Sequence, residues 1–152
     1  MKKLIILDLD HTLIYGSYAE SESAELLFQH NTFLKVYKRP LAEELIKVCK
    51  SKADIIVYTT ALRRYAKRIC HLLAIDPITL LSRKNCITID GKLRKEIKSE
   101  WITNYNRIVI IDDSPNVWMI KYDKIDFLVP HEFRGQENDL GLEITLKELN
   151  CF

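Results

Sequence analysis

Apolar runs and amphipathic stretches alternate along this chain. Runs rich in Ile, Leu and Val have the pattern of strands buried on both faces of a parallel sheet, and they occupy Lys3–Leu9, Asp54–Thr59 and Arg107–Ile111. Between them, apolar residues at helical spacing predict helices over Leu41–Lys50 and Leu62–Leu73. Strands that alternate with helices predict an α/β fold built on a parallel sheet.

The remaining segments carry weaker patterns. A polar stretch follows the first predicted strand, and Ile78–Leu93 is ambiguous between short strands and loop. Pro40 has the position expected at the start of a helix, and Asp90-Gly91 has the composition of a tight turn. Further elements are predicted at Phe33–Tyr37 (strand), Phe127–Val129 (strand) and Thr145–Leu149 (helix).

Length and composition are those of an ordinary globular domain. The chain has 152 residues, of which 47% are hydrophobic and 29% charged, which predicts one domain over residues 1–152 with a sizeable core. The net charge of +2 gives no electrostatic reason to expect a nucleic-acid partner. No stretch resembles a transmembrane helix or a signal peptide, so we expect no association with a membrane. A monomer is expected.

The four cysteines indicate a reducing compartment. They lack any C-x-x-C spacing, and Cys49 and Cys70 fall in apolar helical stretches that are typical of buried thiols. We therefore expect an intracellular protein, located in the cytoplasm, or in the nucleus if the source is eukaryotic.

Paired carboxylates follow two of the predicted strands. Asp8 and Asp10 come at the end of the first strand, and Asp112-Asp113 come directly after Arg107–Ile111. Because ligands of parallel α/β sheets bind beyond the carboxyl ends of the strands, we expect these side chains to share one site. Either pair alone could be a solvated turn. Two pairs in the same setting favour a Mg²⁺ site, where one carboxylate attacks an electrophile and another transfers a proton.

Four segments resemble those of a known family. They are DLDHTLI at 8–14, KRP at 38–40, VYTTALRRYA at 57–66 and IIDDSP at 110–115. Through them, from about Leu4 to Val129, the chain is similar to the haloacid dehalogenase superfamily of phosphohydrolases. Within it, the chain resembles the carboxy-terminal-domain phosphatases, also called NLI-interacting-factor-like phosphatases. The resemblance implies a Rossmann-like parallel sheet flanked by helices, with a short flap at 15–37 over the site.

The resemblance also implies roles for the aspartates. Asp8 would be the nucleophile that forms an aspartyl-phosphate, and Asp10 the general acid that later serves as base toward water. Mg²⁺ would be held by an oxygen of Asp8, the main-chain carbonyl of Asp10, and Asp112 or Asp113. Many members of the family have Asn where this chain has Asp113, so the choice between these two ligands stays open.

Further residues are assigned by the same resemblance. Thr59 ends a predicted strand where the family has a Ser or Thr that binds a phosphate oxygen. Alternatively, a threonine here would cap the following helix, for which Thr60 is better placed. Arg83, in SRKNC, is similar to an arginine that helps to bind substrate phosphate. Thr12 is assigned with Arg83 to substrate binding and is expected to stabilise the loop after Asp10.

The phosphate also needs a cation that offsets its charge in the transition state. The segment Lys95-Glu96-Ile97 is the closest match to the family's lysine segment and makes Lys95 the candidate. An ungapped count back from Asp112 falls on Glu96, so this assignment requires a shift of one residue. Lys92 and Lys98 stay as alternatives, and a solvated surface position is the simplest alternative for any one lysine of this basic stretch.

Three other residues are expected to have structural roles. His11 is interpreted as a loop residue that points away from the metal. Trp101 and Trp118 are expected to pack in the core or to be half-buried, as most tryptophans are.

These observations predict a Mg²⁺-dependent phosphomonoesterase that acts through an aspartyl-phosphate. The resemblance makes phosphoserine or phosphothreonine in a protein or peptide the leading substrate. The chain is near the minimal size of the family and shows no added recognition module, which leaves a small-molecule phosphatase as an alternative. A non-catalytic binding module on the same fold is a third hypothesis, and the complete set of acidic residues argues against it.

Overall fold

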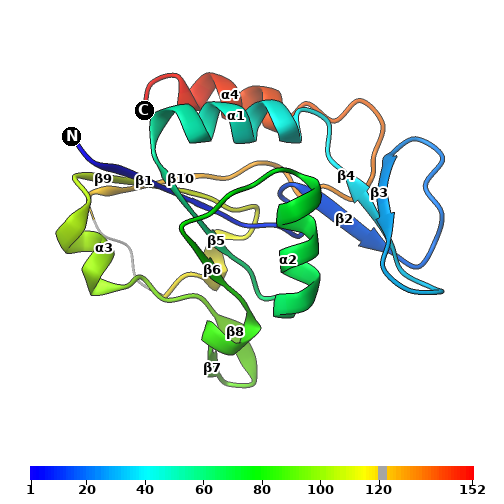
Figure 1. Ribbon diagram of the computed structural model, residues 1–152, viewed down its shortest axis with the longest axis horizontal. Coiled ribbons are helices and arrows are strands. Elements are labelled where there is room, and N and C mark those ends of the chain that lie inside the picture. The colour runs from blue at the N-terminus through cyan, green and yellow to red at the C-terminus, as the bar shows by residue number, and fades with distance from the viewer. Residues whose placement is uncertain (120–122) are drawn as a thin grey trace.

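The computed structural model describes residues 1–119 and 123–152, and its main sheet has five parallel strands in the order β10-β9-β1-β5-β6 (Figure 1). Their bounds are β1 (Lys3–Leu7), β5 (Asp54–Tyr58), β6 (Thr79–Leu81), β9 (Arg107–Ile111) and β10 (Ile125–Leu128). β1 lies between β5 and β9 and is buried over most of its length. The predicted parallel α/β sheet is confirmed, and the last predicted strand begins earlier, at Ile125.

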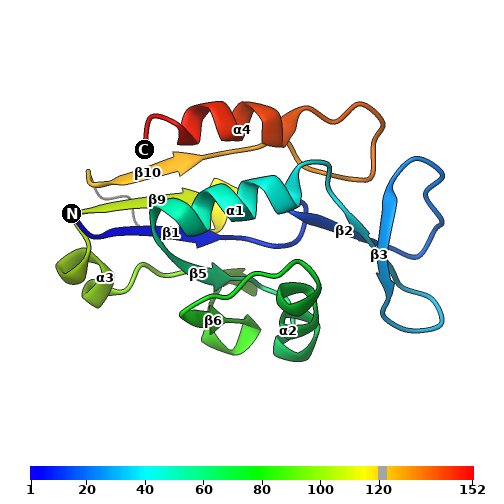
Figure 2. The same cartoon turned by 45° about the horizontal axis from the view of Figure 1, so that its top comes forward.

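Side chains of the sheet alternate between two apolar clusters. On β1, Ile5 and Leu7 belong to one cluster and their neighbours in sequence to the other, as the two-residue period of a strand requires. Helices α1 (Ala42–Lys52) and α4 (Gly141–Leu149) lie side by side over one face, and α3 (Ser99–Asn104) covers the other (Figures 1 and 2). Because both faces are covered, the strands are continuous apolar runs in the sequence.

The predicted helices are present with shifted ends. α1 begins two residues after Pro40, because Leu41 has a left-handed backbone (φ 67°) and precedes the first helical residue. α2 (Arg63–Leu72) agrees with its predicted range to one residue at each end. α4 begins at Gly141 rather than at Thr145. The sequence pattern does not predict α3, because six residues are too few to show a helical period.

The predicted flap is a small antiparallel sheet. Its strands are β2 (Ile14–Ser17), β4 (Lys35–Lys38) and β3 (Glu25–Gln29), in that spatial order. Figure 1 shows this sheet beyond the carboxyl end of β1. The predicted strand Phe33–Tyr37 corresponds to β4, whereas β2 and β3 lie in segments that carry no strand pattern of their own.

The ambiguous segment contains a hairpin. Its strands are β7 (Ile87–Ile89) and β8 (Lys92–Arg94), and the turn residues Asp90 and Gly91 have positive φ values of 50° and 74°. Positive φ at both central residues is the requirement of the tightest hairpin turn, so the predicted turn is confirmed. Among the described residues, no helix combines the length and apolar character that crossing a bilayer requires.

Candidate active site

A sharp turn after β1 presents Asp8 and Asp10 at the carboxyl edge of the sheet. The main-chain carbonyl of Leu9 accepts N–H groups from three residues of this turn, at 2.9 to 3.2 Å. His11 adopts a left-handed backbone with φ 64°. Because the turn uses the Leu9 carbonyl, the strand ends at Leu7 and not at Leu9 as predicted.

Three carboxylates meet at this edge. One oxygen from each of Asp8, Asp112 and Asp113 lies within 4.8 Å of the others. Asp8 follows β1, and the other two follow the neighbouring strand β9. A cavity of about 220 Å³ lies in front of them and is also lined by Asp10 and Lys95. The two acidic pairs of the sequence therefore lie together.

Lys95 is the cation of this cluster. Its Nζ lies 2.8 Å from Asp8 Oδ1 and 2.7 Å from Asp112 Oδ2, and only 1% of the residue is exposed. Burial alone would lower the pKa of Lys95, but the two carboxylates raise it above its ordinary value, so the ammonium group stays charged. Lys92 is exposed and Lys98 pairs with a surface glutamate, so neither alternative lysine joins the cluster.

A short bridge to a later segment fixes the backbone of the lysine. The N–H of Lys95 donates to the carbonyl of Val117 (2.8 Å), and its carbonyl accepts the N–H of Met119 (3.1 Å). The rings of Tyr58 and Trp118 lie 5.9 and 5.5 Å from Nζ. An ammonium group near aromatic faces is attracted by them, so both rings help to hold Nζ between the two aspartates.

The carboxylates of the site are crowded and buried. Burial raises the pKa of Asp8 to about 6 even though Lys95 opposes this shift. Burial, and then the charge of Asp8, raises the pKa of Asp112 to about 6. Burial also raises the pKa values of Asp10 and Asp113. One lysine does not balance four acidic groups, so a further cation would stabilise the site.

Asp112 and Asp113 differ in the groups that bind them. Oδ2 of Asp112 accepts hydrogen bonds from Lys95 and from Nε1 of Trp118 (2.9 Å), and Oδ1 accepts the N–H of Ser114 (2.9 Å). Both oxygens of Asp112 are thus used by protein donors. Trp118 is buried, as predicted, but its hydrogen bond to Asp112 was not foreseen, because nothing in the local sequence indicates it.

Thr12 lies beneath the carboxylates. Its hydroxyl is 2.9 Å from Asp8 Oδ2 and 3.1 Å from Asp113 Oδ1, and it accepts the N–H of Asp113 (3.0 Å). The side chain is fully buried. Thr12 therefore joins the loop after Asp10 to the end of β9, which is the stabilising position that the sequence analysis expected. Asp113 is partly exposed and lines the cavity.

Asp10 stands apart from the cluster of three and contacts the helix α2. The hydroxyl of Tyr65 lies 3.4 Å from Asp10 Oδ1. A Cβ atom at Gly16 would lie 3.2 Å from the same hydroxyl, so the flap strand β2 packs closely against Tyr65. Sequence reasoning did not single out Tyr65, and its only signal was its place in the segment VYTTALRRYA.

The residues predicted to bind phosphate lie near the cavity but at different depths. Thr59 is fully buried, and its hydroxyl accepts the N–H of Ala61 (3.0 Å). Thr60 lines the cavity. Nε of Arg83 donates to the carbonyl of Thr60 (2.9 Å), and Arg83 lines an adjoining groove. The alternative that a threonine caps α2 is wrong, because Leu62 occupies the cap position without a side-chain hydrogen bond.

A buried arginine holds the turn after β1 through hydrogen bonds to its main chain, and sequence reasoning missed this residue. Arg39, from the segment KRP, is fully buried and binds both oxygens of Asp139 (2.7 and 2.9 Å). It also donates to the carbonyls of Thr12 (3.1 Å) and His131 (2.7 Å). A Cβ atom at Gly141 would collide with the guanidinium group, so glycine is needed there. The motif KRP itself was the available signal.

His11 contacts the loop between β10 and α4, to which His131 and Asp139 also belong. Its Nδ1 lies 2.9 Å from the carbonyl oxygen of Phe133 and 3.7 Å from the carboxylate of Glu132. His11 and Glu132 both line the rim of the cavity. The imidazole thus connects the turn after β1 to the segment that follows β10.

The chemistry of the donors fits a hard divalent cation. The clustered groups Asp8, Asp112 and Asp113 are all carboxylates, and oxygen is the ligand atom that Mg²⁺ prefers in proteins. Four carboxylates, those of Asp8, Asp10, Asp112 and Asp113, line a cavity that has one lysine, Lys95, so the site carries an excess of negative charge. A cation of this class would relieve that excess.

Known proteins share the sequence pattern and the fold. The family model of the NLI interacting factor-like phosphatases matches residues 3–150. Phosphatase PSR1 of Saccharomyces cerevisiae is 30% identical over 123 residues, which cover 75% of this chain and 28% of that protein. A C-terminal domain phosphatase of RNA polymerase II from Encephalitozoon cuniculi is 31% identical over 124 residues, which cover 78% of this chain and 29% of that protein.

A solved structure supports the same assignment at the level of the fold. The structure of Fcp1, an essential RNA polymerase II CTD phosphatase, aligns with a TM-score of 0.58 and 16% sequence identity over 99% of this chain and 49% of that chain. This chain therefore spans half or less of the length of these relatives. The predicted family is confirmed by the match to nearly all of the sequence: the chain belongs to the NLI interacting factor-like phosphatase family.

Proposed function

We propose that this protein is a Mg²⁺-dependent phosphomonoesterase that acts through an aspartyl-phosphate. The observation that carries the proposal is the cluster of Asp8, Asp112 and Asp113 around the buried Lys95, in front of a cavity of about 220 Å³. Membership of a phosphatase family supports the same chemistry.

In this proposal Asp8 is the nucleophile. One of its carboxylate oxygens attacks phosphorus in line with the leaving group, so an Asp8 O–P bond forms while the bond from phosphorus to the substrate oxygen breaks. Lys95, 2.8 Å from Asp8 Oδ1, orients this carboxylate and offsets negative charge as the phosphate approaches. Thr12, 2.9 Å from Oδ2, fixes the other oxygen.

Asp10 moves the protons in both steps. Because burial raises its pKa, Asp10 can hold the proton that it gives to the leaving oxygen. It then takes a proton from the water that attacks phosphorus, which releases inorganic phosphate and restores Asp8. Help of this kind is worth roughly 10²–10⁴-fold in rate. Tyr65, 3.4 Å from Asp10 Oδ1, orients the carboxylate, and Thr59 and Arg83 are proposed to bind the phosphate.

The proposed ligands of Mg²⁺ are Asp8, the main-chain carbonyl of Asp10, and Asp113. Asp113 is preferred over Asp112 because Asp112 is 1% exposed and accepts three hydrogen bonds from N–H groups, whereas Asp113 is partly exposed and its Oδ1 lies near only the hydroxyl of Thr12 among the hydrogen bonds of the described residues. When bound, the ion would offset the charge of the substrate phosphate. Asp112 then has the separate task of holding Lys95 in place.

Removal of the metal is expected to abolish turnover of an aryl phosphate. Ca²⁺ is expected to inhibit, because it takes more ligands in looser geometry than Mg²⁺. Without substrate, Mg²⁺ at about 100 times its Kd should raise the free energy of unfolding by about 2.7 kcal/mol, which a thermal melt detects as a higher Tm. Asp113→Ala should lose this increase and Asp112→Asn should keep it. Full turnover after exhaustive chelation would rule out the proposed mechanism.

The surroundings of the cavity favour a protein substrate. A groove of about 570 Å³ leads from Asp10 between the flap and the start of α2, and Tyr18, Leu34 and Leu62 line it. Because the groove adjoins the cavity at Asp10 and His11, residues next to a phosphorylated side chain would lie along it. The relatives named as C-terminal domain phosphatases support the same choice. We therefore propose phosphoserine or phosphothreonine in a protein as the substrate.

Replacement of Tyr18 should separate peptide from small substrates. Tyr18 is 80% exposed and lines the groove, whereas Phe33 is 73% exposed on the same flap and does not line it. Tyr18→Ala is expected to lower phosphopeptide turnover severalfold and to leave turnover of an aryl phosphate unchanged. Phe33→Ala, the matched control, should change neither. Equal losses on both substrates in Tyr18→Ala would remove the main physical support for a peptide substrate.

A substrate panel tests the function itself. Initial rates with Mg²⁺ on phosphopeptides, sugar phosphates and nucleotides should be highest on phosphopeptides. Higher rates on sugar phosphates or nucleotides would favour the small-molecule phosphatase. Absence of turnover on every substrate, including an aryl phosphate, would favour the non-catalytic binding module.

A further inference from the structure

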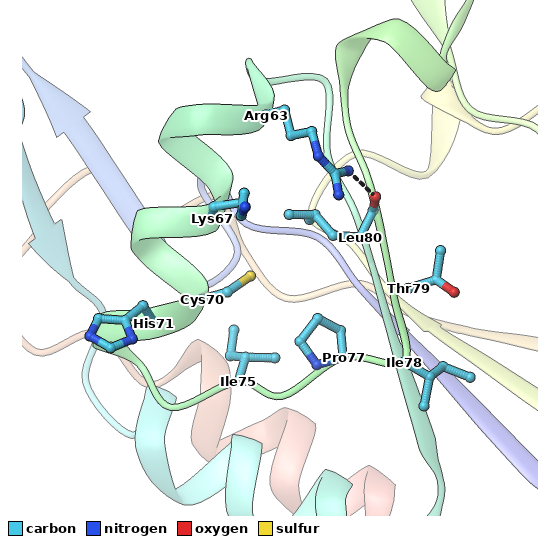
Figure 3. Close-up of a pocket in the computed structure, with 9 residues that line it drawn as sticks. All are labelled: Arg63, Lys67, Cys70, His71, Ile75, Pro77, Ile78, Thr79 and Leu80. Atoms are coloured by element: carbon cyan, nitrogen blue, oxygen red, sulfur yellow. Dashed lines mark hydrogen bonds between the residues drawn. The ribbon is translucent and has the colours of Figure 1, made fainter.

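A second groove lies between α2 and the edge strand β6, and Figure 3 shows the residues that line it. Its volume is about 500 Å³. Ile75, Pro77 and Leu80 give it an apolar surface on one side, and α2 contributes Arg63 and Lys67 on the other. None of these residues lines the cavity of the candidate active site. The groove is therefore a separate feature of the surface.

The helical side of this groove carries positive charge that the described chain does not neutralise. Arg63, Lys67 and His71 of α2 line the groove, and α2 contains no acidic residue. Within residues 1–119 and 123–152, Arg63 and Lys67 form no salt bridge. A positive side chain in the first turn opposes the helix dipole. An anionic partner at this end would relieve both effects.

The strand side of the groove is an open sheet edge. Among the described strands, β6 pairs only with β5. Arg63 Nη1 donates to the carbonyl of Leu80 (2.8 Å), as the dashed line in Figure 3 shows, and this bond holds the guanidinium group beside the strand. The neighbouring Ile78 is 59% exposed. An unpaired edge with apolar side chains is suited to contact another extended chain.

The spacing of the basic residues matches an extended chain. Arg63, Lys67 and His71 are four residues apart, which is about 6 Å along a helix axis. Side chains on one face of an extended strand recur every second residue, at about 6.6–6.8 Å. A strand that lies along α2 would thus place every second side chain opposite a basic residue. The side chains between them would face the apolar side of the groove.

We propose that this groove binds an extended segment of another protein in which acidic and apolar residues alternate. The acidic side chains would pair with Arg63 and Lys67, and the apolar ones would contact Ile75, Pro77 and Leu80. A nucleic acid fits less well, because the residues that line the groove include no Phe, Tyr or Trp on which a base could stack. The proposal does not depend on the phosphatase activity.

Fluorescence anisotropy with labelled peptides tests the proposal directly. One peptide alternates Glu and Val, and a second has the same length and composition with its glutamates in one block. The alternating peptide is expected to bind at least about tenfold more tightly than the block peptide, and Lys67→Glu should weaken its binding by about tenfold or more. Arg64→Glu makes the same charge change on α2 but outside the groove, and it should have less than about a twofold effect.

Four results would overturn the proposal. Equal weakening by Lys67→Glu and Arg64→Glu would show attraction to the net charge alone. Equal affinity for the block peptide, or tighter binding of a single-stranded oligonucleotide, would assign the basic helix to another ligand. Unchanged binding of the alternating peptide to Lys67→Glu would exclude the groove. Circular dichroism and Tm of both variants must match those of the wild type, which shows that they are folded. Because catalysis is not measured, the outcome is independent of the proposed function.

Discussion

Replacement of Asp8 by asparagine is expected to abolish phosphatase turnover without loss of the fold. An amide is a very poor nucleophile, so no aspartyl-phosphate can form. Asparagine has nearly the same size and can still accept a hydrogen bond from Thr12 or Lys95. Since burial raises the pKa of Asp8 to about 6, its charged form is costly in the folded protein, and its removal relieves the crowding. The Tm should therefore be equal to or higher than that of the wild type.

The control for this experiment makes the same chemical change at a distant surface position. Asp126 is exposed and pairs with Arg107 (3.1 Å), so Asp126→Asn should leave both initial rate and Tm almost unchanged. Initial rates on an aryl phosphate with Mg²⁺ and thermal melts measure the two effects. Turnover by Asp8→Asn at the wild-type rate would contradict the assignment of the nucleophile.

Replacement of Lys95 by methionine is expected to reduce both activity and stability strongly. Methionine keeps much of the length of the side chain but leaves Asp8 and Asp112 buried without their cation. Removal of one partner from a buried ion pair typically costs about 3–5 kcal/mol, which a thermal or denaturant melt measures. The same replacement at Lys92 or Lys98, which lie outside the cluster, should change stability by no more than about 0.5 kcal/mol.

A double variant separates the two effects of Lys95. Lys95→Met combined with Asp112→Asn removes one of the two buried carboxylates that are left without a cation, so part of the lost Tm should return. Turnover should stay low, because the phosphate still lacks its cation. Equal, small losses of turnover at all three lysines would show that the alignment of this basic stretch is wrong. Recovery of turnover in the double variant would show that Lys95 acts only on stability.

The central sheet is predictable because of its burial. β1, β5 and β9 are covered on both faces, so nearly every residue in them is apolar, and such runs are visible without any partner strand. β3 shows the opposite case. Of its five residues only Phe28 is buried, and its structure depends on pairing with β4. Because pairing between segments leaves no periodic pattern, β2 and β3 could not be recognised.

The residues of the site likewise divide into those that the sequence predicts and those that depend on tertiary contacts. Asp8 and Asp112 could be predicted to meet, because the carboxyl ends of adjacent parallel strands must lie at one edge. Lys95 could be found only through the family resemblance, since its position depends on the bridge to Trp118. The hydrogen bonds from Trp118 to Asp112 and from Tyr65 to Asp10 arise from tertiary contacts. The sequence alone carries no local sign of them.

The contacts of Arg39 determine when the site can fold during protein synthesis. The turn that carries Asp10 is held by Arg39, whose charge is matched by Asp139. During translation, this turn leaves the ribosome long before Asp139 is synthesised. A buried guanidinium group without its carboxylate is strongly unfavourable. The turn therefore cannot adopt its folded structure in a nascent chain that lacks the loop between β10 and α4. Asp8 is translated well before Asp139, yet the site around Asp8 is completed only after residue 139 has emerged.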